Sequence, residues 1–138
     1  MIIIWNILAK KHQISKEQWK ECKDYFNNEC AYCGLKQEDH FIHRKGKLIN
    51  IDLHKEHVVW NGANDLSNCV PSCQTCNSRK HTYALDKWYN KDNPKFTQER
   101  YDKIIKWITE DYKKFIWLYT TWILWCEEMK IWIVIIIK

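Results

Sequence analysis

The stretch DLHKEHVVWNGANDLSNCVPSCQTCNSRKH, residues 52–81, is unusually rich in side chains that can bind metal ions. It holds three histidines, three carboxylates, four asparagines and three cysteines within thirty residues. Imidazole, thiolate, carboxylate and amide groups are the side chains that bind metal ions in proteins. The stretch therefore predicts a metal-centred site.

Four cysteines fall into two pairs of the form Cys-x-x-Cys, Cys30 with Cys33 and Cys73 with Cys76, separated by 39 residues. This spacing predicts a tetrahedral four-cysteine zinc site, because two thiolates of one turn can face a single ion. Four thiolates leave no open position for substrate, so the zinc is expected to be structural. Redox-active or merely buried thiols are the alternative. The three remaining cysteines, Cys22, Cys69 and Cys126, are expected in the core.

Length and charge set broad limits on the class of protein. A chain of 138 residues with 46% hydrophobic residues can bury one core, and its net charge of +5 with a pI near 8.8 favours an anionic partner such as nucleic acid. Paired cysteines indicate a reducing compartment, and the short apolar run at residues 2–9 lacks the features of a secretory signal. The expected location is the cytoplasm.

The last residues differ in composition from the rest. Residues 115–138 form an apolar tail of unknown role, which has the length of a membrane span but carries Glu127, Glu128 and Lys130 in its middle. Charges at that depth disfavour a membrane contact. An oligomer contact, a surface anchor and a tail without bearing on the chemistry all remain open.

The pattern of caps and apolar residues predicts an α+β chain. Ser15 with Gln18 forms a capping-box pattern, and Thr97 is expected to cap the last helix. The expected elements are helical flanks at 15–28 and 97–114, with the first helix itself at 16–27, a hairpin or loop tip at 45–47, a strand within 48–59, a loop at 61–68, a helix opening at 77–81 and a short helix within 84–89.

A second group of potential ligands lies between and just after the cysteine pairs. Glu56 and His57 are adjacent, Asn68 ends the turn-rich loop, and Asn77 is followed four residues later by His81. If both lie on a helix, residues 77 and 81 share one face and can address one ion. Oxygen and imidazole ligands suit a divalent ion that works on phosphate.

These motifs resemble the HNH endonucleases of the ββα-metal group. The resemblance is carried by CAYCG (30–34), KEHVV (55–59), GANDLSN (62–68) and NCVPSCQTCNSRK (68–80), and it is similar to the zinc-bracketed pattern of small bacterial and phage nucleases. It implies a small ββα-metal finger in which two antiparallel strands and a helix hold one catalytic ion, Mg²⁺ or Mn²⁺. One nuclease domain is then expected over residues 1–114, with its core at 30–81.

The resemblance also implies a role for each matching residue. His57 would be the general base that activates water, and Asn68 would brace the loop and orient that base. Glu56 and Asn77 would bind the catalytic ion, and His81 matches a position where some members carry an additional ligand. The implied activity is hydrolysis of DNA phosphodiester bonds, leaving 5′-phosphate and 3′-hydroxyl ends.

Three questions stay open at this level. Arg79 and Lys80 are candidates for holding substrate phosphates, although a solvated basic face explains them equally well. Glu56 and His57 point to opposite faces of an ideal strand, so their cooperation requires a bulge or a strand end near Glu56. Otherwise His54, with Asp52 or Glu56 on the same face, carries the chemistry instead. A zinc-bearing nucleic-acid-binding module without catalysis is the competing function, and a homodimer is possible.

Overall fold

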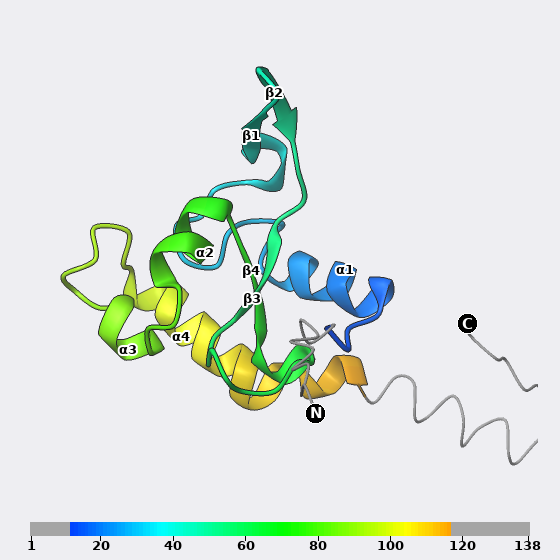
Figure 1. Ribbon diagram of the computed structural model, residues 1–138. Helices are drawn as coiled ribbons and strands as arrows, with labels where there is room; N and C mark the ends of the chain where they lie inside the picture. Colours follow the sequence, from blue (N-terminus) through cyan, green and yellow to red (C-terminus); the bar gives the residue numbers. More distant parts are fainter. Residues whose placement is uncertain (1–11, 117–138) are drawn as a thin grey trace, which may run out of the picture.

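The computed structural model describes residues 12–116, which form an α+β fold with two separate two-stranded antiparallel sheets (Figure 1). This confirms the expected fold class. Residues 117–138, with Cys126, lie outside the described residues. Among the helices of residues 12–116, none has the length and hydropathy of a membrane span. The elements are α1 (Lys16–Tyr25), β1 (Phe41–Arg44), β2 (Lys47–Asn50), β3 (His54–His57), β4 (Cys69–Ser72), α2 (Gln74–Lys80), α3 (Leu85–Trp88) and α4 (Gln98–Lys106).

Strands β3 and β4 and helix α2 form the ββα unit. The register pairs His54 with Ser72 and His57 with Cys69, with one residue opposite one along the whole ladder. In Figure 1 this pair of strands runs through the middle of the molecule, between α1 on one side and α2 on the other. Of the two arrangements expected near Glu56, the structure has the strand end and not the bulge, because the ladder is regular and β3 ends at His57.

The helix caps follow the sequence closely. Ser15 Oγ accepts the Gln18 N–H at 3.0 Å while Gln18 Oε1 accepts the Ser15 N–H at 3.1 Å, which confirms the capping box. Thr97 Oγ1 accepts the Arg100 N–H at 3.2 Å at the start of α4. Helix α1 ends at Tyr25, earlier than predicted, since residues 27 and 28 take positive φ angles of 58° and 55°.

Trp107 lies at the centre of the core and is fully buried. It begins a π-helical turn, Trp107–Asp111, that continues α4, and its Nε1 donates to the Cys69 carbonyl on β4 at 2.9 Å. Cys22 of α1 is also fully buried and its thiol lies 3.7 Å from the same carbonyl. The expected core positions of Cys22 and Cys69 are thus confirmed. Both α1 and the π-helical turn after α4 contact the same carbonyl of β4.

Two local predictions need adjustment. The strand expected within 48–59 is in fact two strands, because β2 ends at Asn50 and β3 begins at His54. The predicted tip is confirmed as a two-residue turn, in which Lys45 and Gly46 have φ angles of 50° and 74°, as a type I′ hairpin requires. Helix α2 starts at Gln74, three residues before the prediction, because the Cys73 thiol accepts the Cys76 N–H at 3.5 Å and so caps the helix.

Candidate functional site

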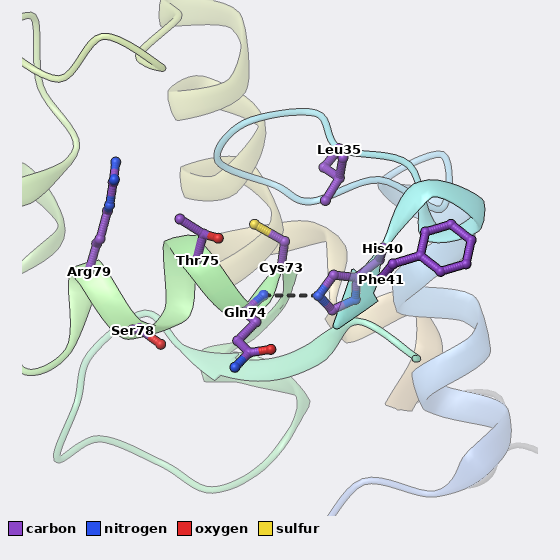
Figure 2. A pocket seen from close by; sticks show the side chains of 8 residues that line it. All are labelled: Leu35, His40, Phe41, Cys73, Gln74, Thr75, Ser78 and Arg79. Carbon is purple, nitrogen blue, oxygen red and sulfur yellow. Dashed lines mark hydrogen bonds between the residues drawn. The ribbon is translucent and has the colours of Figure 1, made fainter. Parts of the chain in front are cut away.

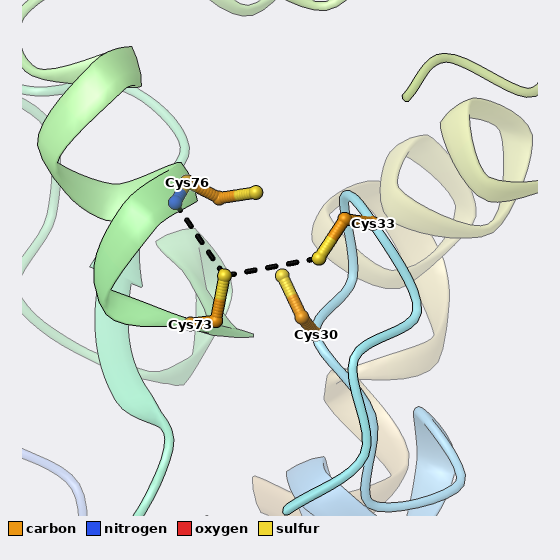
Figure 3. Close-up of side chains that lie close together, drawn as sticks. All are labelled: Cys30, Cys33, Cys73 and Cys76. Atoms are coloured by element: carbon orange, nitrogen blue, oxygen red, sulfur yellow. Dashed lines mark hydrogen bonds between the residues drawn. The ribbon is translucent and has the colours of Figure 1, made fainter. Parts of the chain in front are cut away.

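The two cysteine pairs meet in one cluster (Figure 3). Their sulfur atoms all lie within 4.8 Å of one another, and Cys33 Sγ is 3.7 Å from Cys73 Sγ. A tetrahedral zinc site with Zn–S bonds of about 2.3 Å has edges of about 3.8 Å, whereas a disulfide bond is about 2.05 Å long. The four cysteines therefore have the spacing of a metal site and not that of two disulfides.

Each half of the cluster is shaped by its own backbone. The Gly34 N–H bonds the Cys30 carbonyl at 2.8 Å, and Gly34 has a φ of 74°, a conformation that glycine adopts readily. A Cβ on Gly34 would collide with the Arg100 guanidinium.

The close approach of Cys33, then of Cys73 and Cys76, lowers the pKa of the Cys30 thiol, since each neighbour can hydrogen bond to its thiolate. Deprotonated sulfur is the form that binds zinc.

His57 lies at the end of β3, where its ring is held from two sides. Its Nε2 lies 2.8 Å from Asn64 Oδ1, and the His12 ring stacks on it with 4.7 Å between centroids and 20° between planes. The Gln13 N–H bonds the Asn64 carbonyl at 2.7 Å, so the segment before α1 is fixed to the same loop. Sequence reasoning missed both Asn64 and His12, because one is an ordinary loop asparagine and the other is 45 residues away from His57.

Asn68 closes the loop between β3 and β4. Its side-chain Oδ1 accepts the Val59 N–H at 2.8 Å, and its Nδ2 donates to the Val59 and Ala63 carbonyls, each at 2.9 Å. The side chain thereby extends the ladder just beyond His57. Gly62 lies against it, since a Cβ there would come within 2.7 Å of Asn68 Nδ2.

Glu56 is buried and forms an ion pair with Lys80, whose side chain is 0% exposed. Lys80 Nζ lies 3.0 Å from Glu56 Oε1 and donates to the His57 carbonyl at 2.8 Å. Burial raises the pKa of Glu56, against the opposing attraction of Lys80. The sequence suggested an exposed Lys80 near substrate; the structure instead places it inside, where it ties α2 to the end of β3.

Asn77 is half-buried in α2, but His81 lies outside that helix. His81 has a φ of 45° and a ψ of −121°, is exposed, and its Nδ1 lies 3.3 Å from Thr82 Oγ1. The shared helical face assumed for the two residues is therefore wrong, because the helix ends at Lys80. Across residues 12–116, the four cysteines make up the sole group of three or more His, Cys, Asp or Glu side chains close enough to hold one ion.

The His54 alternative finds little support in the packing. His54 Nε2 is buried without a hydrogen-bond partner, and its ring meets that of His40 edge-on at 5.7 Å. Asp52, the carboxylate considered for it, bonds Trp19 Nε1 at 3.0 Å and Lys23 at 2.7 Å on α1. Burial lowers the pKa of His54. His57, by contrast, has a hydrogen-bond partner in Asn64 Oδ1.

A hollow of about 360 Å³ lies between the outer face of α2 and the start of β1 (Figure 2). Arg79 is exposed at its edge, and the Gln74 N–H donates to His40 Nε2 at 3.0 Å, which joins the two walls. Arg79 is thus accessible to a phosphate, in contrast to Lys80. The lining residues are Leu35, His40, Phe41, Cys73, Gln74, Thr75, Ser78 and Arg79.

A two-stranded ribbon and a helix, bracketed by a four-cysteine cluster and carrying His57 and Asn68, define a small ββα-metal fold. The protein-family model described as HNH endonuclease matches residues 30–83 of the chain. It is 58% identical over 99 residues to a protein of Bacillus subtilis (strain 168) named "SPbeta prophage-derived putative HNH endonuclease YoqL".

That alignment covers 72% of this chain and 43% of the relative, so the chain spans less than half of that protein's length. No solved structure matches the chain.

Proposed function

We propose that the protein is a metal-dependent endonuclease that hydrolyses phosphodiester bonds of DNA in the cytoplasm, with His57 as the general base. The observation that carries this proposal is the placement of His57 within an HNH domain, at a strand end, with its ring bonded to Asn64 and stacked on His12. A general base must be held in one orientation to take a proton from a water molecule aligned with the phosphorus atom.

The contact with Asn64 defines which nitrogen of His57 can act. An amide oxygen only accepts hydrogen bonds, so the Nε2 atom facing Asn64 Oδ1 at 2.8 Å carries the proton. Nδ1 then has the free lone pair and is the atom that takes a proton from water. Asn68 supports this geometry by fixing the backbone of Val59, two residues beyond the base.

We propose structural zinc for the four cysteines and a second divalent ion, Mg²⁺ or Mn²⁺, held by Glu56 and Asn77 with His81 as a further ligand. Carboxylate and amide oxygens are the hard ligands that these ions prefer. Because Lys80 contacts Glu56 Oε1, the ion would share this carboxylate with an ammonium group. Bound there, the ion would stabilise negative charge on the phosphate and on the leaving 3′-oxygen. Arg79 would contact a flanking phosphate.

A zinc-bearing DNA-binding module without catalysis is the second candidate. The Glu56–Lys80 ion pair favours it, since the one buried carboxylate of the site is already neutralised by the chain itself. A module of this kind would still need the cysteine cluster and the exposed cations, but it would have no use for an oriented His57.

Cleavage of supercoiled plasmid separates the two functions. Purified protein with Mg²⁺ or Mn²⁺ should nick the plasmid and yield 5′-phosphate ends, and EDTA should stop the reaction. His57→Ala should lower the rate by about 10² to 10⁴, the usual contribution of a general base, while His54→Ala, the matched control on the same strand, should retain cleavage. Absence of cleavage by every form, with zinc bound and DNA still retained, would leave the binding module.

A further inference from the structure

Residues 41–50, here called the basic ribbon, project from the body of the protein. Strands β1 and β2 with their two-residue turn extend away from the helices at the top of Figure 1. Every strand residue of the basic ribbon except Ile42 is exposed. Because this hairpin buries little apolar surface, it contributes little to the core. The stability of the fold therefore does not explain which residues the hairpin carries.

The charges of the basic ribbon are all of one sign. Arg44, Lys45 and Lys47 surround the tip, and residues 41–50 contain no Asp or Glu. Arg44 and Lys47 are directly opposite each other in the register, an arrangement that destabilises a hairpin. None of the three cations forms an ion pair within residues 12–116. Within the described residues no carboxylate offsets the charge of this cluster, and a polyanion would do so.

The shape of the basic ribbon suits duplex DNA. The major groove of B-DNA, about 12 Å wide and 8.5 Å deep, admits a two-stranded β-ribbon. Strands of four residues extend about 14 Å at roughly 3.4 Å per residue, which is enough to bring the tip across a phosphate backbone. Backbone phosphates supply most of the affinity of proteins for DNA.

The base of the basic ribbon is firmly joined to the helix that carries Asn77. Asn50 Nδ2 donates to the carbonyls of Gln37 at 3.0 Å and of His40 at 3.2 Å, which anchors the end of β2. His40, 2% exposed, in turn accepts the Gln74 N–H at the start of α2. DNA held by the ribbon would therefore have a fixed position relative to α2.

We propose that the basic ribbon is a DNA-contacting arm, in which Arg44, Lys45 and Lys47 bind backbone phosphates of duplex DNA outside the cleavage site. This inference rests on the proposed function in taking DNA as the substrate. It adds a surface that holds DNA independently of the catalytic ion and of His57. The ribbon increases affinity and takes no part in the reaction itself.

The test measures binding and cleavage separately. Fluorescence anisotropy with a labelled 30-base-pair duplex in EDTA gives Kd between 50 and 300 mM salt for the full chain. The Arg44→Gln, Lys45→Gln, Lys47→Gln triple variant is compared with the triple variant Lys87→Gln, Lys91→Gln, Lys95→Gln. The control removes the same charge from exposed lysines on and beyond α3, far from the ribbon in Figure 1. Circular dichroism and zinc content verify that both variants fold.

The ribbon variant should bind at least about tenfold more weakly at 0.1 M salt, and its salt slope should fall by about 2.7, or 0.9 for each phosphate lost. The control should retain the wild-type slope. Equal losses in both variants, or no loss in the ribbon variant, would overturn the proposal. So would a change from dimer to monomer in the ribbon variant with DNA binding intact, because the ribbon would then contact a second copy. Loss of binding in the ribbon variant of a protein that never cleaves DNA would support the arm and refute the nuclease.

Discussion

The protein contains two antiparallel ribbons of equal strand length that differ in how far they are buried. Strands β1 and β2 are joined by two residues and are exposed along nearly their whole length, whereas β4 is fully buried and β3 is partly so. The first ribbon carries three cations that have no ion-pair partner among residues 12–116, and the second carries Glu56 bonded to Lys80. Both ribbons have regular registers.

The difference shows that hydrogen bonding within a ribbon does not decide its role. β3 and β4 are buried because α1, α2 and the turn after α4 cover them, and burial makes their polar groups costly unless each is paired. Lys80, which pairs with Glu56, also donates to the His57 carbonyl and so holds the end of β3 in place. The exposed ribbon has no such requirement, so its side chains are available to a partner.

Loss of the cysteine cluster should have the largest effect, because the buried ribbon runs directly into it. Cys73→Ser removes a thiolate that also caps α2 and should abolish zinc binding, with loss of a cooperative thermal transition in circular dichroism. Cys22→Ala, a buried cysteine outside the cluster, should retain stoichiometric zinc with a lower melting temperature. A zinc-free Cys73→Ser protein that melts like wild type would contradict a structural role for the metal.

Lys80→Met should be the next most damaging change, since it leaves the Glu56 carboxylate buried without its partner. We expect a loss of about 3–5 kcal/mol in the free energy of unfolding, measured by urea denaturation. Lys47→Met removes the same charge from the exposed ribbon and should change stability by no more than about 0.5 kcal/mol. Adding Glu56→Gln to Lys80→Met should restore part of the loss. Equal effects at positions 80 and 47 would remove the distinction between the ribbons.

The glycines beside the two ribbons should differ in what they affect. Gly62→Ala pushes Asn68 away from Val59 and should slow plasmid cleavage by about 10- to 100-fold, the scale of a small misplacement of a catalytic group. Gly46→Ala meets no atom within 4 Å but forces Ala to a positive φ, at a cost of about 1 kcal/mol within the exposed turn. Cleavage at saturating DNA should then stay unchanged. A Gly62→Ala protein with the wild-type rate would separate Asn68 from the chemistry.

The smallest expected effect is a pH dependence of stability at Asp111, in the π-helical turn that follows α4. Hydrogen bonds from Lys114, then from Tyr25 at 2.8 Å, lower the pKa of Asp111 below its usual 3.8. This stabilisation is complete above the unfolded pKa and is lost as the pH falls through the folded pKa. The difference in melting temperature between wild type and Asp111→Asn should therefore shrink as the pH falls from about 6 to below 3.8. A difference that does not change with pH would indicate that Asp111 is not stabilised as a carboxylate.

Local sequence patterns were sufficient for part of this fold. The capping box at Ser15, the Thr97 cap and the turn at Lys45-Gly46 depend on residues that are neighbours along the chain, and all three are confirmed. The cysteine spacing likewise predicted the cluster, because a Cys-x-x-Cys turn already places two sulfur atoms on one side. The placement of Asn68 beside the His57 strand end also agrees with the resemblance; its catalytic role stays a prediction.

Residues that are neighbours along the chain therefore predict the local turns, the caps and the metal-ligand pairs, together with the family they resemble. The tertiary structure alone decided that Lys80 is buried against Glu56, that Asn64 and His12 hold the His57 ring, and that His81 lies beyond the end of its helix. The ion pair and the ring contacts join segments that are distant along the chain, so they depend on how these segments pack together. A charge or ring that this packing buries must then find its partner within the protein. The cap that starts α2 is local, because the Cys73 thiol accepts the N–H of Cys76 three residues later, whereas the cysteine cluster joins Cys33 to Cys73 across 40 residues and therefore depends on the tertiary packing.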